Sequence, residues 1–189
     1  MNAAEYQSYF SQIVNGKIEE LDAPYNQQDY FDYTKLNWAR FSRYFKTKPF
    51  TATFLNTISE IKESQNWLLI TEPWCGDAAH NAAFIIMAAE INPLIQLTIE
   101  LRDHEPFSIE KYLTNGTKSI PKLVIRDRVG NDLAIWGPRP EACHTLYQKL
   151  KEEQVSSEEM MFQIHSWYAT DKGESLQDEL EDVIMKTIQ

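Results

Sequence analysis

The chain has 189 residues, 43% of them apolar, which is enough to build one domain with its own hydrophobic core. Its formal net charge is −10, and residues 151–189 carry most of it, with three basic residues against ten acidic ones. The sequence has no basic stripe to neutralise phosphates and no apolar run that could cross a bilayer, which excludes nucleic-acid and membrane partners.

Cysteine usage and the first residues bear on the compartment. The chain has two cysteines, and residues 1–10 lack the basic start and apolar run of a secretory signal. We therefore expect a cytoplasmic protein without a disulfide framework. Histidines and cysteines do not show the spacing of metal ligands, and there is no glycine-rich phosphate loop, so we expect neither a metal nor another cofactor.

Residues 1–49 predict a helical N-terminal extension that packs on the following domain. Apolar residues at helical spacing indicate a first helix around Tyr6, Phe10 and Ile13. A second, short helix is expected over residues 30–37, on the spacing of Tyr30, Tyr33, Leu36 and Asn37. A third helix is expected after Pro49, with residues 54, 55, 58 and 61 along one side.

Residues 50–153 alternate between strands and helices. Residues 67–70 predict a buried strand, 76–91 a helix buried nearly all round, 95–101 a strand and 105–113 a helix. Residues 123–125 and 133–136 flank a Gly-Asn turn and predict a hairpin, after which Pro140 opens a helix to about residue 153. This order predicts an α/β fold with a mixed sheet: a parallel pair with a right-handed crossover, extended by the hairpin.

Residues 154–189 predict a C-terminal helical extension packed on the domain. Met161, Ile164 and Tyr168 define the apolar side of one helix, and a turn follows at 171–173. A second helix is expected to start with a capping box formed by Ser175 and Asp178.

The segment T-E-P-W-C-G-D-A-A-H, residues 71–80, holds the main candidate for chemistry. Cys75 stands where the first strand gives way to the buried helix, so free backbone N–H groups and the helix dipole favour its thiolate. Asp77 adds a negative charge that disfavours the thiolate, and the sequence leaves open which effect is larger. Trp74 would shield the sulfur and offer a flat apolar contact to a partner.

This strand–W-C-G-D–helix unit, followed by S-I-P at 119–121 and W-G-P at 136–138, resembles the thioredoxin superfamily over roughly residues 50–150. More narrowly, the chain is similar to a bacterial group of thioredoxin-like proteins with a helical N-terminal extension and a W-Y-x-x-D-K-G tail, here residues 167–173. The resemblance implies a thioredoxin-like fold, a central mixed sheet flanked by helices with helical extensions at both ends.

The resemblance also implies a binding site around Cys75. In the superfamily the proline that corresponds to Pro121 is cis and faces the active-site cysteine, and the residue before it pairs with an extended peptide or a glutathione-like ligand. The residues expected to bind substrate around the catalytic Cys75 are Trp74, Gly76, Asp77, Ile120, Pro121, Trp136 and Gly137, with Pro138 and Arg139 nearby.

The second cysteine of the superfamily is missing, because position 78 is Ala. That cysteine resolves the mixed disulfide with a substrate. Cys143 is the other sulfur of the chain, but it shares a helix face with Leu146, Tyr147 and Leu150, so we interpret it as a core residue and keep resolution as the alternative.

Four polar residues near the site receive a structural interpretation first. His80 is expected to point away from Cys75, and to be partly exposed or satisfied by a neighbour. We expect Glu72 to be solvated rather than to accept a proton from the thiol. For Arg102 and Arg139 we favour surface ion pairs over a role at the site.

Three functional hypotheses follow. The first is a monothiol redox protein in which Cys75 forms mixed disulfides with protein or low-molecular-weight thiols and an external thiol resolves them. The second is a redox-inactive binding or adaptor module on the same fold. The third is a dithiol enzyme that uses Cys143. The first two are an enzyme of thiol–disulfide exchange and a binding protein, and the sequence favours the enzyme only slightly.

Overall fold

Four strands form one mixed sheet in the order β2-β1-β3-β4. The computed structural model describes residues 1–47 and 50–188. The strands are β1 (Gln65–Thr71), β2 (Ile95–Leu101), β3 (Lys122–Arg126) and β4 (Asp132–Trp136). The helices are α1 (Ala3–Asn15), α2 (Gln28–Thr47), α3 (Ala52–Ser59), α4 (Gly76–Ile91), α5 (Glu141–Glu152), α6 (Ser157–Asp171) and α7 (Glu174–Met185), with short 3-10 turns at Ile18–Glu20 and Ser108–Lys111.

The sheet has the predicted pairing. β1 runs parallel to β2, from Gln65 opposite Ile95 to Thr71 opposite Leu101, and α4 makes the crossover between them. β1 is antiparallel to β3, and β3 forms the predicted hairpin with β4, with a register shift between Ile125 and Arg126. β1 is buried along nearly its whole length because strands flank it on both sides and helices cover one face.

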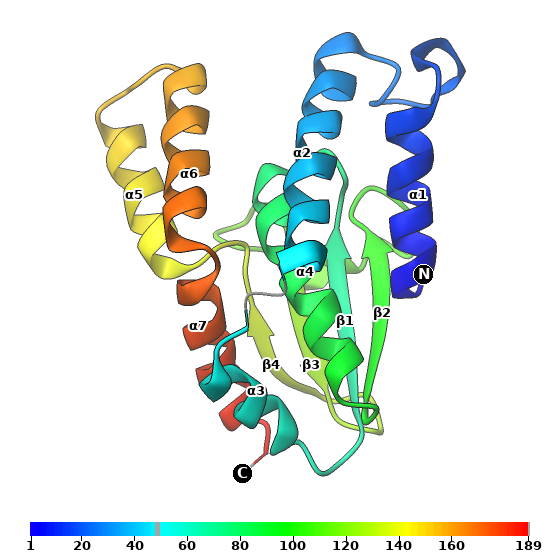
Figure 1. Cartoon of the computed structure of the whole chain (residues 1–189), viewed down its shortest axis with the longest axis vertical. Coiled ribbons are helices and arrows are strands. Elements are labelled where there is room, and N and C mark those ends of the chain that lie inside the picture. Colours follow the sequence, from blue (N-terminus) through cyan, green and yellow to red (C-terminus); the bar gives the residue numbers. More distant parts are fainter. Residues whose placement is uncertain (48–49, 189) are drawn as a thin grey trace.

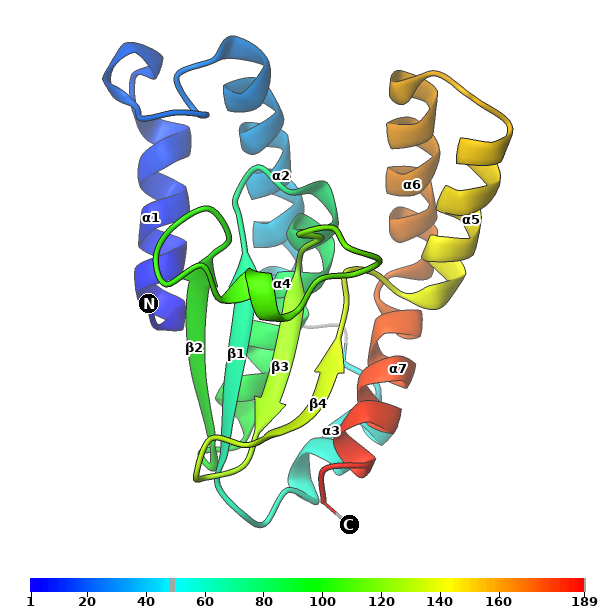
Figure 2. The ribbon, with the colours of Figure 1, turned by 180° about the vertical axis from the view of Figure 1, so that it is seen from behind.

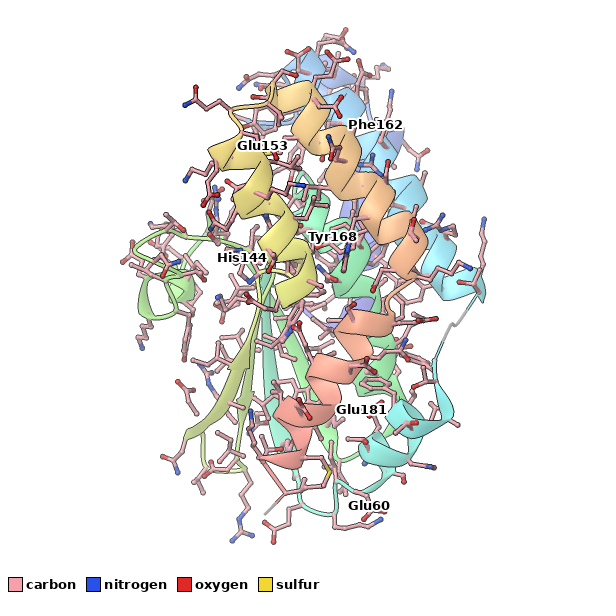
Figure 3. The ribbon with its side chains drawn as sticks, turned by 90° about the vertical axis from the view of Figure 1, so that its left-hand side faces the viewer. Glu60, His144, Glu153, Phe162, Tyr168 and Glu181 are labelled. Atoms are coloured by element: carbon pink, nitrogen blue, oxygen red, sulfur yellow. The ribbon has the colours of Figure 1, made fainter. Side chains whose placement is uncertain are left out.

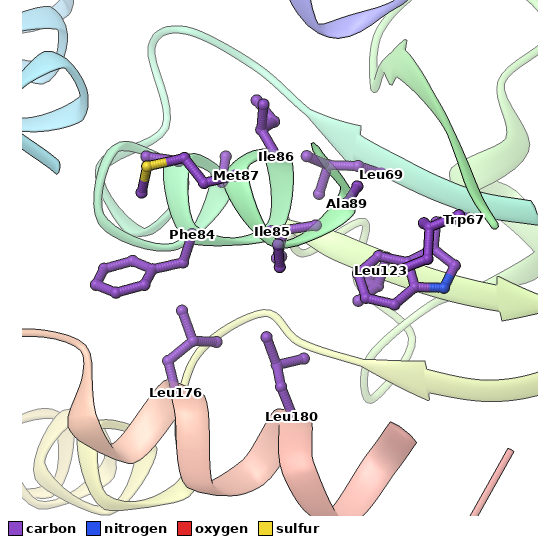
Figure 4. Packing of buried hydrophobic residues seen from close by; sticks show 14 of the residues in the cluster. Trp67, Leu69, Phe84, Ile85, Ile86, Met87, Ala89, Leu123, Leu176 and Leu180 are labelled. Atoms are coloured by element: carbon purple, nitrogen blue, oxygen red, sulfur yellow. The ribbon is translucent and has the colours of Figure 1, made fainter. Parts of the chain in front are cut away.

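Helices cover one face of the sheet in two layers. α4 lies directly on the strands and α2 lies over α4 (Figure 1). This position explains why α4 is apolar all round, since its residues from Ala78 to Ala89 are all buried. α7 closes the edge of the same core beside β4, where Leu176 and Leu180 approach Phe84 of α4 (Figure 4). The two terminal segments therefore belong to the main core, and their division from residues 50–153 stays a prediction.

Two pairs of helices extend beyond the end of the sheet at which β1 ends. α1 and α2 stand on one side, and α5 and α6 stand on the other (Figure 1). Figure 2 shows the opposite face of the sheet, where the segment between β2 and β3 crosses the same end of the strands. The loop between β1 and α4 thus opens between the two helix pairs.

Three sequence predictions about local structure were wrong. The second helix is not short: α2 has 20 residues, because Phe31, Phe41 and Tyr44 carry its buried face well past Asn37. Residues 105–113 form only the turn Ser108–Lys111, since Phe107 has φ 54° and interrupts any right-handed helix. Pro49, the predicted start of the third helix, lies outside the described residues.

The third wrong prediction is the capping box at Ser175. The N-cap of α7 is Gly173, two residues before Ser175, and no side chain caps it. Asp171 supplies the acceptors instead, because its carboxylate accepts from the backbone amides of Gly173 at 3.1 Å and Ser175 at 3.2 Å. Gly173 has φ 86°, and a side chain there would run into the ring of Phe84, so this turn requires glycine.

Candidate functional site

Cys75 occupies the N-cap of α4 and faces the loop before β3. Its Sγ accepts from the Ala78 amide at 3.5 Å, and its S–H donates to the Ile120 carbonyl oxygen at 3.3 Å. The Ile120–Pro121 peptide bond is cis. The structure therefore brings together the residues on which the predicted site depends, the thiol and the proline loop.

A cavity opens on each side of Trp74 and Cys75. One has a volume of about 310 Å³ and a polar, basic wall. The other has a volume of about 490 Å³ and lies between the start of α2, the loop at 74–76 and α6. The first is lined further by Asp77, Arg102, Thr117, Lys118, Ser119, Ile120, Pro138 and Arg139, and the second by Asp29, Tyr30, Tyr33, Gly76 and Met161.

The Cys75 thiol is held in its neutral form. The residue is 8% exposed, and burial raises the pKa of the thiol to about 12, with the charge of Asp77 as the second cause. The backbone N–H groups of Ala78 and Asp77 lower that pKa, as the helix start predicts, but they do not offset the burial. Burial and the charge of Asp77 therefore outweigh the helix start, and the protonated thiol is the favoured form of Cys75.

Asp77 and Arg139 form an ion pair inside the site. An Arg139 guanidinium nitrogen donates to Asp77 Oδ2 at 2.5 Å, and their side chains are only 15% and 11% exposed. The Tyr168 hydroxyl donates to Asp77 Oδ1 at 2.8 Å, where α6 passes α4 (Figure 3). Burial raises the pKa of Asp77, although Arg139 and Tyr168 oppose that shift. The predicted surface ion pair of Arg139 is therefore wrong, because its partner is a buried site residue.

The prediction for Arg102 is correct, and the prediction for Glu72 is wrong. Arg102 makes the predicted pair with Asp103, at 2.7 Å, and also lies over the Trp74 ring at 4.5 Å. Glu72 is not solvated: it is 2% exposed, and it accepts from the Tyr25 hydroxyl at 3.2 Å and the Asp103 amide at 3.1 Å. Burial raises the pKa of Glu72.

The end of the hairpin lies only partly at the site. The backbone of Gly137 abuts the Pro121 carbonyl so closely that a side chain at 137 would not fit, and its φ is 113°. Trp136 instead packs in the main core, and its indole donates to Glu179 at 2.7 Å. Trp136 does not line either of the cavities that Cys75 lines among the described residues.

Cys143 is a core residue of the α5–α6 pair. It is fully buried among Leu150, Ile164 and Tyr168, in a different apolar cluster from Cys75. Burial raises the pKa of its thiol to about 12 as well. Both cysteines are free. These observations support the structural interpretation of Cys143.

A chain of four hydrogen-bonded rings joins α2, α4 and α6 beside the site, and no local sequence pattern indicates it. The Tyr33 hydroxyl contacts His165 Nε2 at 2.7 Å, and His165 Nδ1 contacts His80 Nε2 at 3.0 Å. His80 Nδ1 contacts the Tyr44 hydroxyl at 3.1 Å. His80 is 3% exposed, so it is satisfied, as one interpretation expected, but not exposed.

Neither His80 nor His165 is expected to gain a proton in the folded protein between pH 7 and pH 5. Burial lowers the pKa of His80 to about 2 and that of His165 to about 4. In the unfolded chain both rings gain a proton near pH 6.5, so they make the folded state less stable as the pH falls below that value, by up to about 1.4 kcal/mol per pH unit for His80. NMR of the ring carbons should show neither residue titrating between pH 7 and 5, and a midpoint near 6.5 for either would contradict the structure.

Gly76 has no room for a side chain, so a substitution there should destabilise the protein. A Cβ at position 76 would overlap the Tyr33 hydroxyl oxygen and lie 3.0 Å from His165 Cε1. We expect Gly76→Ala to lower the free energy of unfolding by about 1–3 kcal/mol, because the overlap forces α2 and α6 apart. Urea denaturation measures the loss. Adding Tyr33→Phe, which removes the overlapping oxygen, should return part of it, and an equal loss in the double variant would contradict the overlap.

Two further features are absent from the part of the chain that the structure describes. In residues 1–47 and 50–188, no three histidine, cysteine or acidic side chains gather in a way that could hold a metal ion. None of the helices described above is long and apolar enough to cross a membrane.

Comparison with known proteins identifies a family model and two solved structures. The family model, described as thioredoxin, matches residues 24–151. A Pseudomonas aeruginosa protein of unknown function is 18% identical with a TM-score of 0.52, over 92% of this chain and 98% of the other. An HIV epitope-scaffold gives the same identity and TM-score over 100% and 96%. No curated protein matches the chain significantly. The structural matches agree with the predicted α/β fold class, which is confirmed.

Proposed function

The chain belongs to the thioredoxin family, and we propose that it is a peptide-binding member in which the Cys75 thiol stays protonated at neutral pH. The observation that carries this proposal is the burial of Cys75, which is 8% exposed. Burial raises the pKa of the thiol to about 12, and the S–H group donates to the Ile120 carbonyl oxygen. A nucleophilic cysteine needs its thiolate, and these contacts favour the thiol.

The edge next to Cys75 supports binding of an extended segment. Among the described residues, nothing accepts a hydrogen bond from the Ile120 amide, and β3 starts only at Lys122. A backbone amide beside an open cavity can pair with the carbonyl of an added strand. We infer a protein partner that lies across Trp74 and Cys75, with one cavity on each side.

Titration with short peptides tests the proposal. A panel of capped, cysteine-free pentapeptides is added to the protein, and the Ile120 amide signal is followed by NMR. We expect the signal to move, with equal affinity for the wild type and Cys75→Ser. Affinity that disappears in Cys75→Ser, or an Ile120 signal that no peptide moves, would contradict peptide binding.

A second candidate, single-thiol exchange, rests on the position of Cys75 at the wall of both cavities. A disulfide that entered either cavity would meet the sulfur, and an external thiol would release the mixed disulfide. Incubation with glutathione disulfide at pH 7.4, followed by mass spectrometry, separates the candidates. A rapid adduct at Cys75 favours exchange, whereas an unmodified Cys75 favours the binding protein.

A further inference from the structure

The larger cavity beside Cys75 has mostly apolar walls, which come from the start of α2, the segment 74–76 and Met161 of α6. Tyr30 and Met161 are each 41% exposed, and Tyr30 meets Trp74 edge to face at 6.3 Å. A second hollow of about 410 Å³ continues the surface, sharing Tyr33 and Met161 and adding Phe162 near the free end of α6 (Figure 3). Apolar walls with few polar groups are typical of sites that bind an apolar group.

The direction of the hydrogen bonds among Tyr44, His80, His165 and Tyr33 determines whether the Tyr33 hydroxyl is free to donate to a ligand. Arg43 can only donate, and it donates to the Tyr44 hydroxyl oxygen at 3.4 Å. In one direction, the Tyr44 hydroxyl donates to His80 Nδ1. His80 then carries its hydrogen on Nε2 and donates it to His165 Nδ1. His165 in turn carries its hydrogen on Nε2 and donates it to the Tyr33 oxygen. The Tyr33 oxygen accepts, so the hydrogen of its hydroxyl remains available.

The opposite direction is less favourable. There, His80 and Arg43 would both donate to Tyr44, and the Tyr44 hydrogen would have no acceptor although the residue is 3% exposed. A buried donor without an acceptor costs about 1–3 kcal/mol. The first direction avoids this cost, since Tyr33 lines the open cavity and can donate there.

The Tyr33 hydroxyl also lies beside the residue that follows Cys75. Its oxygen occupies the place that a side chain at Gly76 would fill, one residue after Cys75. Tyr33 is thus a hydrogen-bond donor at the point where the apolar cavity meets the site of the proposed peptide.

We propose that this cavity binds one large apolar side chain of a peptide, and that the Tyr33 hydroxyl donates to a carbonyl oxygen of the same peptide. The inference rests on the proposed function and extends it, because it names the residue class that the peptide carries beside Cys75. The occupant follows from the mostly apolar walls, from the oriented Tyr33 donor, and from Trp74 and Cys75, which line both this cavity and the one that Ile120 lines.

Histidine tautomers test the donor without any ligand. Long-range nitrogen–proton NMR distinguishes a ring that carries its hydrogen on Nε2 from one that carries it on Nδ1. We expect the Nε2–H form for both His80 and His165. The Nδ1–H form at His165 would mean that Tyr33 already donates to it, and would overturn the donor role.

Two matched peptides test the cavity. A capped pentapeptide with a central phenylalanine is compared with its serine counterpart by the NMR signals of the Ile120 amide and the Trp74 indole. We expect the phenylalanine peptide to bind more tightly and to move both signals. Tyr33→Phe should weaken it about fivefold, whereas Tyr30→Phe, the matched control, should change affinity less than twofold.

The outcomes separate this inference from the proposed function. If both peptides move Ile120 equally and the Trp74 indole does not respond, the chain binds peptides but the cavity does not select them, and the inference fails. If neither peptide moves Ile120, the proposed function fails. Met161→Glu, at an exposed position, gives a second readout, because a carboxylate on the cavity wall should remove the preference for phenylalanine.

Discussion

Alkylation of Cys75 by iodoacetamide at pH 7.4 is expected to run about three orders of magnitude slower than that of a free cysteine. The reagent attacks the thiolate, whose fraction falls about tenfold for each unit by which the pKa rises, and here burial raises the pKa from 9.0 to about 12. The measurement uses Cys143→Ser, so that the adduct found by mass spectrometry reports Cys75 alone. A rate that reaches half its maximum near pH 8.5 would contradict the buried thiol.

Asp77→Asn isolates the electrostatic part of this effect. The charge of Asp77 is the second cause of the raised pKa, and its removal also leaves Arg139 free to favour the thiolate. We expect faster alkylation of Cys75 in Asp77→Asn than in the parent Cys143→Ser protein. Asp127→Asn, on the exposed hairpin turn, serves as the control and should leave the rate unchanged.

Loss of Arg139 is expected to have the largest effect on stability. Arg139→Met leaves the Asp77 carboxylate buried without its countercharge, which should lower the free energy of unfolding by about 3 kcal/mol. Without Arg139 the folded-state pKa of Asp77 rises further above its unfolded value. The loss should therefore be small at acid pH and grow as the pH rises through that range. Urea denaturation at pH 5 and pH 8 measures both predictions.

A double variant supplies the control for this prediction. Asp77→Asn combined with Arg139→Met removes both charges, so it should be more stable than Arg139→Met alone. Simple addition of the two single losses would show that the residues act independently, and would contradict a coupled ion pair.

Sequence reasoning placed the regular elements well where burial alone determines them. The bounds of α4 and β2 were predicted to the residue, because one element is apolar all round and the other alternates with period two. It failed at 105–113, where Phe107 adopts a left-handed conformation that no apolar pattern reveals. It also made α2 too short, although Trp38, Phe41 and Tyr44 continue the helical apolar spacing beyond Asn37.

The chemistry of the site depends on partners that are distant in sequence. Arg139 meets Asp77 across 62 positions, and His165 meets His80 across 85. Local spacing around Cys75 correctly indicated a helix start and a neighbouring proline loop. It could not indicate that an aspartate two residues away brings a buried arginine, or that a histidine from the last fifth of the chain would reach α4.

These contacts between residues far apart in the sequence also have a consequence for synthesis of the chain. Tyr33 pairs with His165, which the ribosome adds 132 residues later. A nascent chain that has left the ribosome up to the sheet but not through α6 still lacks Met161, which lines the larger cavity beside Cys75. This apolar cavity is therefore complete only after the sheet has been synthesised, when α6 docks.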